Sequence, residues 1–150
     1  VPEGERRIVH GDFRPGNLSY GAQGRVLAVF DWELATLGDP LADLAWLLSS
    51  WQRPGDTEPP VTPGPSMAKG FAERDDLIQA YATATGRDLR ELDYYLAFSR
   101  WRSACIGAGV AARYQAGVMG DRDGSDRAAD ARTAAVTAQI HAAARMLGLR

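Results

Sequence analysis

A short loop sequence followed at a fixed distance by one aspartate constrains this chain more than any other feature. The sequence HGDFRPGN occupies residues 10–17, and Asp31 follows Asn17 by fourteen residues, directly after the apolar run VLAVF. The glycine-rich stretch 21–24 separates two segments, 17–20 and 25–30, that are expected to pair as a β-hairpin. Such a hairpin brings Asn17 at its entrance and Asp31 at its exit to the same end of the paired strands.

Asp12, Asn17 and Asp31 offer the three groups that phosphoryl transfer requires. The reaction needs one carboxylate to orient the acceptor hydroxyl, and oxygen ligands for Mg²⁺ on the nucleotide phosphates. The five-residue step from Asp12 to Asn17 equals that of the protein-kinase loop H-R-D-x-x-x-x-N, and Asp31 stands where D-F-G would. We therefore expect Asp12 to be catalytic and Asn17 and Asp31 to hold the metal and the nucleotide. The alternative for Asp12 is a loop aspartate that caps a turn.

Three linked motifs carry a resemblance to a known family. With H-G-D-x-x-P-x-N, D-W-E at residues 31–33 and G-D-P-L-A-D-L-A at 38–45, the chain resembles the aminoglycoside phosphotransferase and choline kinase group of small-molecule kinases. Segment 81–113 resembles the subfamily related to the kinase-like domain fused to acyl-CoA dehydrogenases in some animals. The resemblance implies the C-terminal lobe of a protein-kinase-like fold, mainly α with a small β-hairpin (α+β), which uses ATP and Mg²⁺ to phosphorylate a small-molecule hydroxyl acceptor.

The other lobe of such a kinase has no counterpart in this sequence. That lobe carries a nucleotide-covering loop, a lysine and a glutamate, but only nine residues precede His10 and the single lysine, Lys69, lies downstream. The sequence GAGVAA at 107–112 matches a dinucleotide fingerprint superficially; no strand pattern precedes it, so close helix packing is the better interpretation. We expect this chain to be inactive alone and able to form a homodimer through the surface left by the missing lobe.

Four further residues in the motifs are expected to have supporting roles. Arg14 occupies the place of a lysine that meets the transferred phosphate, where a guanidinium could stabilise negative charge; the alternative is a solvated loop arginine. Glu33 could bind a second metal, orient Asp31 or touch substrate. By resemblance, His10 props the loop from beneath and Asp43 holds the loop backbone. The alternative for Asp43 is an acidic residue favoured by a helix N-terminus.

The resemblance implies that helices after the loop build the acceptor pocket. The candidates are aromatic and basic residues, although aromatic residues at helical spacing usually belong to the core: Tyr94, Arg100, Trp101 and Arg102. A pocket lined by arginines favours an anionic acceptor, whereas aminoglycosides are polycations, and no acidic run that would hold one is evident. A hydroxylated metabolite that carries a carboxylate or a CoA-like phosphate is therefore preferred over antibiotic resistance.

Two other classes of function compete with a kinase. A pseudokinase-type binding or regulatory module would keep the fold without catalysis, which the intact Asp12, Asn17 and Asp31 argue against. A metal-dependent phosphohydrolase could use His10, Asp12 and Asp31, but such sites generally need more ligands than two histidines in the whole chain allow.

Composition limits the remaining possibilities. The 150 residues, 45% of them hydrophobic, suit one domain with a core. Seventeen basic against nineteen acidic residues give a net charge of −2, without the excess that nucleic-acid binding requires. One cysteine and no apolar stretch of membrane-spanning length predict a cytoplasmic protein with no membrane partner. Sixteen of the seventeen basic residues are arginine, which hints at a GC-rich bacterial genome.

The remaining sequence reads as helices separated by loops. Asp39 and Pro40 are typical of a helix N-terminus and open a helix to about residue 51. Residues 53–66 hold five of the eight prolines and predict a surface loop. Three more helices are expected at about 72–85, 89–116 and 126–147, with breaks at Gly86 and 117–124. No internal repeat or domain boundary is evident.

Overall fold

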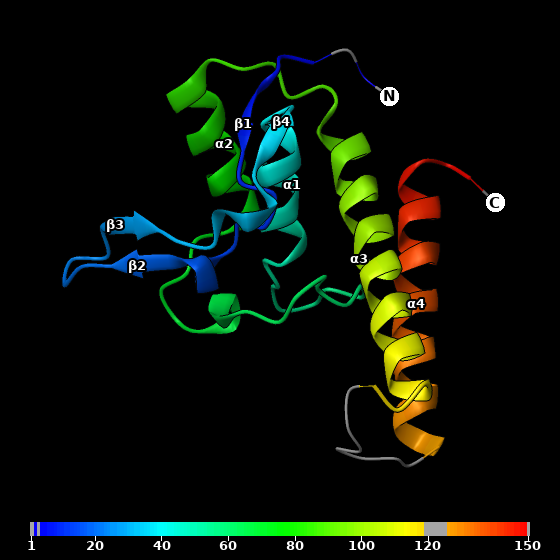
Figure 1. Cartoon of the computed structure of the whole chain (residues 1–150). Helices are drawn as coiled ribbons and strands as arrows, with labels where there is room; N and C mark the ends of the chain where they lie inside the picture. Colours follow the sequence, from blue (N-terminus) through cyan, green and yellow to red (C-terminus); the bar gives the residue numbers. More distant parts are fainter. Residues whose placement is uncertain (1, 3, 119–125, 150) are drawn as a thin grey trace.

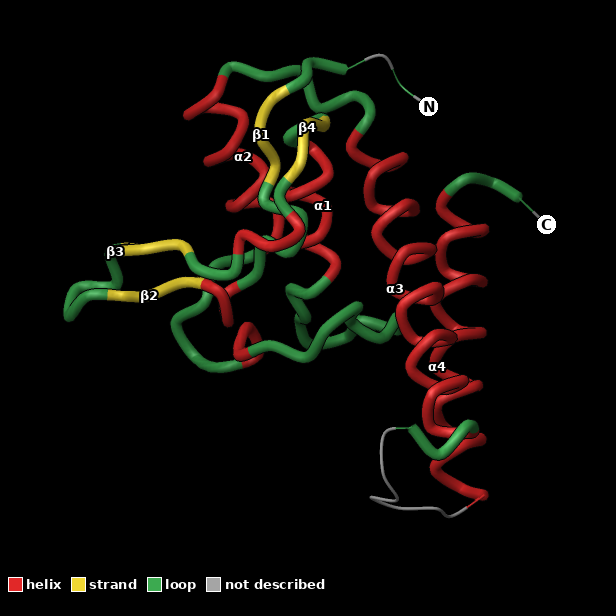
Figure 2. Tube along the Cα trace, viewed as in Figure 1, coloured by secondary structure: helices red, strands yellow, loops and turns green. Residues whose placement is uncertain are grey.

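The computed structural model describes residues 2, 4–118 and 126–149. The chain is mainly α-helical with a small β-hairpin, as predicted, and it also contains a second two-stranded sheet (Figures 1 and 2). The strands and helices follow one another as β1 (Arg7–Val9), β2 (Leu18–Tyr20), β3 (Val26–Val29), β4 (Thr36–Gly38), α1 (Leu41–Ser49), α2 (Arg74–Thr85), α3 (Leu92–Gln115) and α4 (Asp126–Met146). The long helices α3 and α4 run antiparallel on one side of the molecule, and the sheets with α1 and α2 occupy the other (Figure 1).

Strands β2 and β3 form the predicted hairpin. They pair antiparallel with Leu18 opposite Val29, and a register shift lies between Ser19 and Tyr20. At the open end of the hairpin, the backbone N–H of Phe30 donates to the carbonyl of Asn17 over 2.8 Å. The segments that carry Asn17 and Asp31 are therefore joined by a direct backbone hydrogen bond.

Strands β1 and β4 form a second antiparallel pair that the sequence did not predict. Ile8 lies opposite Leu37, and Val9 lies opposite Thr36. Each strand has only three residues, too few for an alternating pattern to be recognised. This pair fixes the two ends of the segment 10–35, which contains every residue of the predicted loop and hairpin.

Helix α1 supplies the centre of the core. Its N-terminus uses the predicted aspartate, because Oδ1 of Asp39 accepts a hydrogen bond from the backbone N–H of Leu41 over 2.9 Å. The helix ends at Ser49, two residues before the predicted end. Its apolar face packs against α3 in one buried cluster made of Leu41, Leu44, Ala45, Leu48, Leu92 and Tyr95.

Helix α3 packs along α4, and the two helices approach each other closely at one glycine. A Cβ built on Gly107 would lie 3.0 Å from Cγ2 of Val136 in α4, whereas one built on Gly109 would meet no atom within 4 Å. The GAGVAA sequence is thus a helix-packing segment, as predicted. Gly86 and Gly117 adopt positive φ angles of 65° and 70° at the ends of α2 and α3. The rest of the predicted break at 117–124 lies outside the described residues, apart from residue 118.

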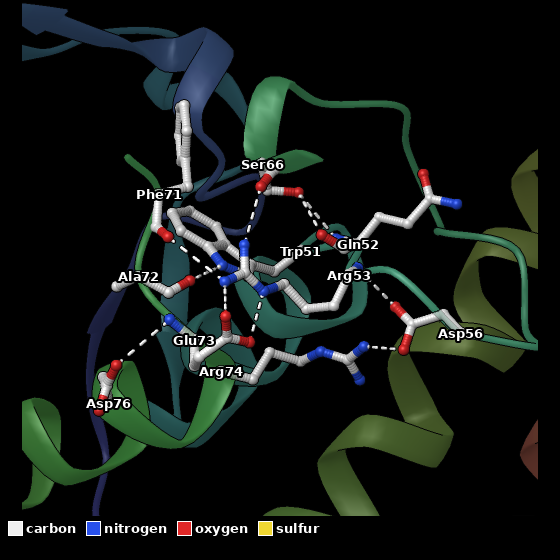
Figure 3. Close-up of polar contacts among 10 residues, drawn as sticks. All are labelled: Trp51, Gln52, Arg53, Asp56, Ser66, Phe71, Ala72, Glu73, Arg74 and Asp76. Atoms are coloured by element: carbon white, nitrogen blue, oxygen red, sulfur yellow. Dashed lines mark hydrogen bonds and ion pairs between the residues drawn. The ribbon is translucent and has the colours of Figure 1, made fainter. Parts of the chain in front are cut away.

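The proline-rich segment 53–66 contains no helix or strand up to a 3₁₀ turn at Pro65–Met67. It is held at both ends, because the Arg53 side chain donates to Glu73 and to the carbonyls of Ser66 and Phe71 (Figure 3). Ser66 is buried and exchanges hydrogen bonds with the backbone of Gln52.

Among the described helices, none combines the length and apolarity that a membrane crossing requires.

Candidate active site

The loop 10–17 begins directly after β1 and is anchored by α1. The carboxylate of Asp43, in the first turn of α1, accepts hydrogen bonds from the backbone N–H of His10 at 2.6 Å and of Gly11 at 2.9 Å. Gly11 has a φ of 84°, and a Cβ there would lie 2.5 Å from the carbonyl oxygen of Leu34. Only glycine fits this close approach, so the loop begins in one defined conformation.

Three donors surround the carboxylate of Asp12. Its Oδ2 accepts hydrogen bonds from Nε of Arg14 at 3.0 Å and from Nδ2 of Asn17 at 2.9 Å, and its Oδ1 accepts one from Nε1 of Trp46 at 2.8 Å. Partial burial by itself would raise the pKa of Asp12, but the hydrogen bonds from Arg14, Trp46 and Asn17 together hold it below the ordinary value. Asp12 is therefore a fixed, ionised carboxylate at neutral pH.

Trp46 is the residue of this site that the sequence analysis missed. It lies in the middle of α1 and is only 3% exposed. A buried indole N–H needs an acceptor, and a polar group within reach of α1 was the signal that could have identified it. Arg102 of α3 lies over the Trp46 ring, 4.3 Å from its centre, and donates to the carbonyl of Gly11.

Asn17 connects Asp12 to the hairpin. Its buried side chain donates from Nδ2 to both the carbonyl and the carboxylate of Asp12. The donors of the amide thus face the loop, and within the part of the chain that the structure describes, its Oδ1 accepts no hydrogen bond. A carbonyl-type oxygen of this kind suits a hard divalent cation.

Asp31 has the backbone conformation that marks the exit of the hairpin. Its φ of 66° and ψ of 54° are left-handed, and it is the one residue other than glycine with a positive φ among the described residues. Such a conformation costs free energy and is often found at functional sites. Its side chain is exposed and has no hydrogen-bond or ion-pair partner in the described part of the chain. The carboxylate is therefore available to a ligand, and it lies one residue from the Phe30–Asn17 hydrogen bond.

His10 joins the loop to the Asp31 segment. Its Nδ1 accepts a hydrogen bond from the backbone N–H of Asp12 at 3.1 Å, so its Nε2 carries the proton and donates to the carbonyl of Phe30 at 2.7 Å. The imidazole is 2% exposed and lies 4.8 Å from the ring of Trp32. His10 therefore holds the residues on both sides of Asp31 against the loop.

The oxygen atoms at this site can supply part of the coordination shell of a divalent cation. Asn17 and Asp31 provide two oxygens at the end of the hairpin, and Glu33 lies exposed in the 3₁₀ turn Trp32–Leu34. Over the described residues, no group of three His, Cys, Asp or Glu side chains gathers closely enough to hold a metal ion. These oxygens match a cation whose remaining ligands come from phosphates and water, as Mg²⁺ usually has in phosphoryl-transfer sites.

Within the described part of the chain, the four acceptor candidates point to different places rather than into one pocket, which differs from the expectation from sequence. Tyr94 and Trp101 line an apolar cleft of about 280 Å³ between α3 and α4. Arg100 is buried and donates to the carbonyl of Pro59 and to Oε1 of Gln139. Of these four residues, and among the described contacts, Arg102 is the one that reaches the loop 10–17. Successive residues of a helix point in different directions, and the sequence could not show which direction faces the loop.

Comparisons with known proteins agree with this arrangement. The model of the phosphotransferase enzyme family matches residues 1–95. The chain is 36% identical over 127 residues to acyl-CoA dehydrogenase family member 11 from Homo sapiens, and 36% identical over 115 residues to family member 10 from Mus musculus. These matches cover 81% and 69% of this chain but only 16% and 10% of those proteins.

A solved structure extends the similarity to the fold. A putative aminoglycoside phosphotransferase from Ralstonia eutropha superposes with a TM-score of 0.71 at 31% identity, covering 97% of this chain and 44% of that one. The mainly α architecture with its small hairpin is thus the C-terminal lobe of a kinase-like fold. From its family match, its relatives and its fold, the chain belongs to the phosphotransferase enzyme family.

Proposed function

We propose that this chain is the catalytic lobe of an ATP-dependent kinase that transfers the γ-phosphate to a hydroxyl of a small metabolite. The observation that carries the proposal is the Asp12 carboxylate, which three donors hold in place beside Asn17. A carboxylate fixed in this way can orient an acceptor hydroxyl without rearranging. Because the chain spans only 44% of the solved relative, the complete enzyme is proposed to contain a nucleotide-binding lobe as well.

In the proposed reaction, Asp12 accepts a hydrogen bond from the acceptor hydroxyl and takes its proton late in the transfer. The hydroxyl oxygen forms a bond to the γ-phosphorus, the bond from that phosphorus to the β,γ-bridging oxygen breaks, and ADP leaves. Asn17 and Asp31 would hold Mg²⁺, which neutralises charge on the phosphates when bound. Glu33 lies exposed two residues after Asp31 and is a candidate ligand for a second ion.

Arg14 has a double role in this proposal. Its Nε donates to Asp12, while about one third of its side chain remains exposed. The terminal nitrogens of its guanidinium can therefore meet the transferred phosphate without leaving Asp12, which would stabilise charge in the transition state.

The acceptor is proposed to carry an anionic group. Two guanidinium groups, Arg14 and Arg102, lie at the loop 10–17. A polycationic aminoglycoside would place its ammonium groups beside these cations, and like charges in close contact oppose binding. Antibiotic resistance is therefore the weaker candidate, and a hydroxylated organic acid is the stronger one.

The test uses the enzyme that contains both lobes, supplied with labelled ATP, Mg²⁺ and two acceptor panels. One panel holds hydroxylated carboxylic acids and their thioesters, and the other holds aminoglycosides. Transfer to the first panel that disappears in Asp12→Asn supports the proposal. Transfer only to aminoglycosides would reject the acceptor class, and phosphate release without acceptor that persists in Asp12→Asn would reject the mechanism.

A pseudokinase remains the alternative if no transfer occurs. It predicts that ATP and Mg²⁺ bind while Asp12→Asn changes nothing. A phosphohydrolase predicts tight metal binding without nucleotide, whereas the kinase proposal expects weak metal binding until phosphates complete the coordination shell.

A further inference from the structure

A small cavity lies between the C-terminal end of α1, α3 and the proline-rich segment. It has a volume of about 130 Å³ and adjoins a wider cleft of about 480 Å³. The two share the residues Leu48, Ser49, Asp56, Arg74, Arg100 and Met146. The residues of the candidate active site at 10–17, 31 and 33 line neither space, so the cavity is separate from that site.

Arg100 enters this cavity as a buried cation with incomplete hydrogen bonding. The residue is 6% exposed, and its Nη1 donates to the carbonyl of Pro59 at 2.7 Å and to Oε1 of Gln139 at 2.9 Å. Both acceptors are neutral, and among the described residues no carboxylate forms an ion pair with Arg100. Its Nε–H has no partner there. A buried guanidinium without a counter-ion is unfavourable, and burial lowers the pKa of Arg100.

Ser49 lines the same cavity and carries a second buried polar atom without a partner in the part of the chain that the structure describes. The residue is 5% exposed, and in the described structure its Oγ has no hydrogen-bond partner. Buried polar atoms are usually satisfied, so two unsatisfied ones on residues that line one cavity call for a shared explanation. A ligand that accepts hydrogen bonds from both would provide it.

The carboxylates nearest to the cavity are already engaged. Asp56 pairs with Arg74, as Figure 3 shows, and Glu58 pairs with Arg145 at 2.5 Å. Each of these acidic groups forms its ion pair with another arginine, so neither is paired directly with Arg100 among the described residues. The same two carboxylates would repel a ligand of high negative charge.

We propose that this cavity is a binding site for the carboxylate group of a small molecule, held by the Arg100 Nε–H and the Ser49 hydroxyl. A planar carboxylate matches the guanidinium fork, and one of its oxygens can also accept from a hydroxyl. The cavity is smaller than typical drug-sized pockets of roughly 300–1,000 Å³, so it holds one small group. Any larger part of the ligand extends into the adjoining cleft.

Nuclear magnetic resonance of the 150-residue chain tests the proposal directly. The Nε–H signal of Arg100, assigned through its bond-by-bond correlations to the Arg100 backbone and by its loss in Arg100→Gln, is followed during separate titrations with sodium acetate, sodium phosphate and sodium chloride at matched ionic strength. We expect a saturable shift with acetate, half complete at millimolar concentration, and none with chloride. An equal response to both salts, or a response only to inorganic phosphate, would overturn the proposal.

Two variants and one control complete the experiment. Ser49→Ala should weaken acetate binding several-fold while the Arg100 signal remains observable, so the test does not depend on whether Arg100→Gln folds. Arg90→Gln removes the same charge from an exposed residue paired with Asp88 and should bind acetate like the original chain. Unchanged acetate affinity in Ser49→Ala, or an equal loss in Arg90→Gln, would contradict the assignment.

Discussion

Trp46 donates its indole N–H to Oδ1 of Asp12 over 2.8 Å and thereby ties helix α1 to the loop 10–17. The opposite oxygen of the carboxylate is held by Arg14 and Asn17. The two sets of donors restrain both oxygens of Asp12, so its orientation is set by residues up to 34 positions away. This relationship makes Trp46 a positioning residue in the proposed kinase, and it leads to the first prediction.

Replacing Trp46 with phenylalanine should reduce kcat of the two-lobed enzyme while KM for ATP stays nearly constant. The variant keeps most of the packing but removes one hydrogen bond to a charged group, worth about 1.5–3 kcal/mol or roughly 10–100-fold in rate. Steady-state kinetics checks the result. Trp101→Phe, at an exposed residue of α3, is the matched control and should leave kcat unchanged.

The same variant should also change the pH dependence. The Trp46 hydrogen bond is one of the causes that lower the pKa of Asp12, so its loss raises that pKa. An ionised Asp12 is required for activity, and the acidic limb of the kcat/KM profile should therefore move to higher pH in Trp46→Phe. A profile that moves to lower pH, or an equal shift in Trp101→Phe, would contradict the role given to Trp46.

Substitutions of Asp12 and Asp31 should impair different steps of the reaction. Asp12→Asn should lower kcat by about 10²–10⁴-fold, the usual contribution of a general base, while Mg·ATP still binds. Asp31→Asn should instead weaken Mg·ATP binding, by at least the roughly 10–100-fold that loss of a supporting group costs a metal site. Calorimetry with a non-hydrolysable nucleotide separates the two effects. Full turnover in Asp12→Asn would refute its assignment.

Asp43 should matter for stability before it matters for catalysis. Asp43→Ala leaves the backbone N–H groups of His10 and Gly11 without their acceptor, which should cost about 3 kcal/mol in the free energy of unfolding. Denaturant unfolding measures this loss. Asp75→Ala, at an exposed residue in the first turn of α2, should cost less than about 1 kcal/mol. Equal effects of the two substitutions would show that Asp43 does not anchor the loop.

Alanine at three glycines should give three different results. Gly109→Ala should stabilise the chain by up to about 1 kcal/mol, because a Cβ there meets no atom within 4 Å in the helix. Gly107→Ala should stabilise the chain less or destabilise it, because the new Cβ would force Val136 to move. Gly11→Ala should destabilise most, because its φ of 84° and the Leu34 carbonyl both oppose a side chain. Thermal unfolding ranks the variants, and any other order would contradict the packing described.

The 150-residue chain should self-associate through the β1–β4 sheet. Ile8 and Leu37 lie opposite each other and are 73% and 68% exposed, which leaves an apolar surface that a second copy can cover. Light scattering should show a dimer whose fraction falls in the double variant Ile8→Ser and Leu37→Ser. Leu149→Ser, at another exposed apolar residue, is the control. Equal loss of dimer in both would place the interface elsewhere.

The features that could be predicted from the sequence are those that depend on neighbouring residues. The hairpin follows from two apolar segments around a glycine-rich turn, and α1 follows from Asp39 and Pro40 before a regular apolar face. The spacing of Asp12, Asn17 and Asp31 along the chain can likewise be read directly from the sequence. Such features need no knowledge of distant residues, because short-range hydrogen bonds and side-chain spacing decide them.

The distant side chains that meet the loop 10–17 could not be predicted in this way. Arg102 contacts Gly11 across 91 positions of sequence, whereas Arg100, two residues earlier, turns toward Gln139 and a separate cavity. The pairing of β1 with β4 likewise joins segments whose own patterns are too short to predict it. The directions of these side chains and the pairing of these strands are set by how whole helices and strands pack. That packing depends on burial and hydrogen bonding summed over the entire chain, and no local spacing reveals it.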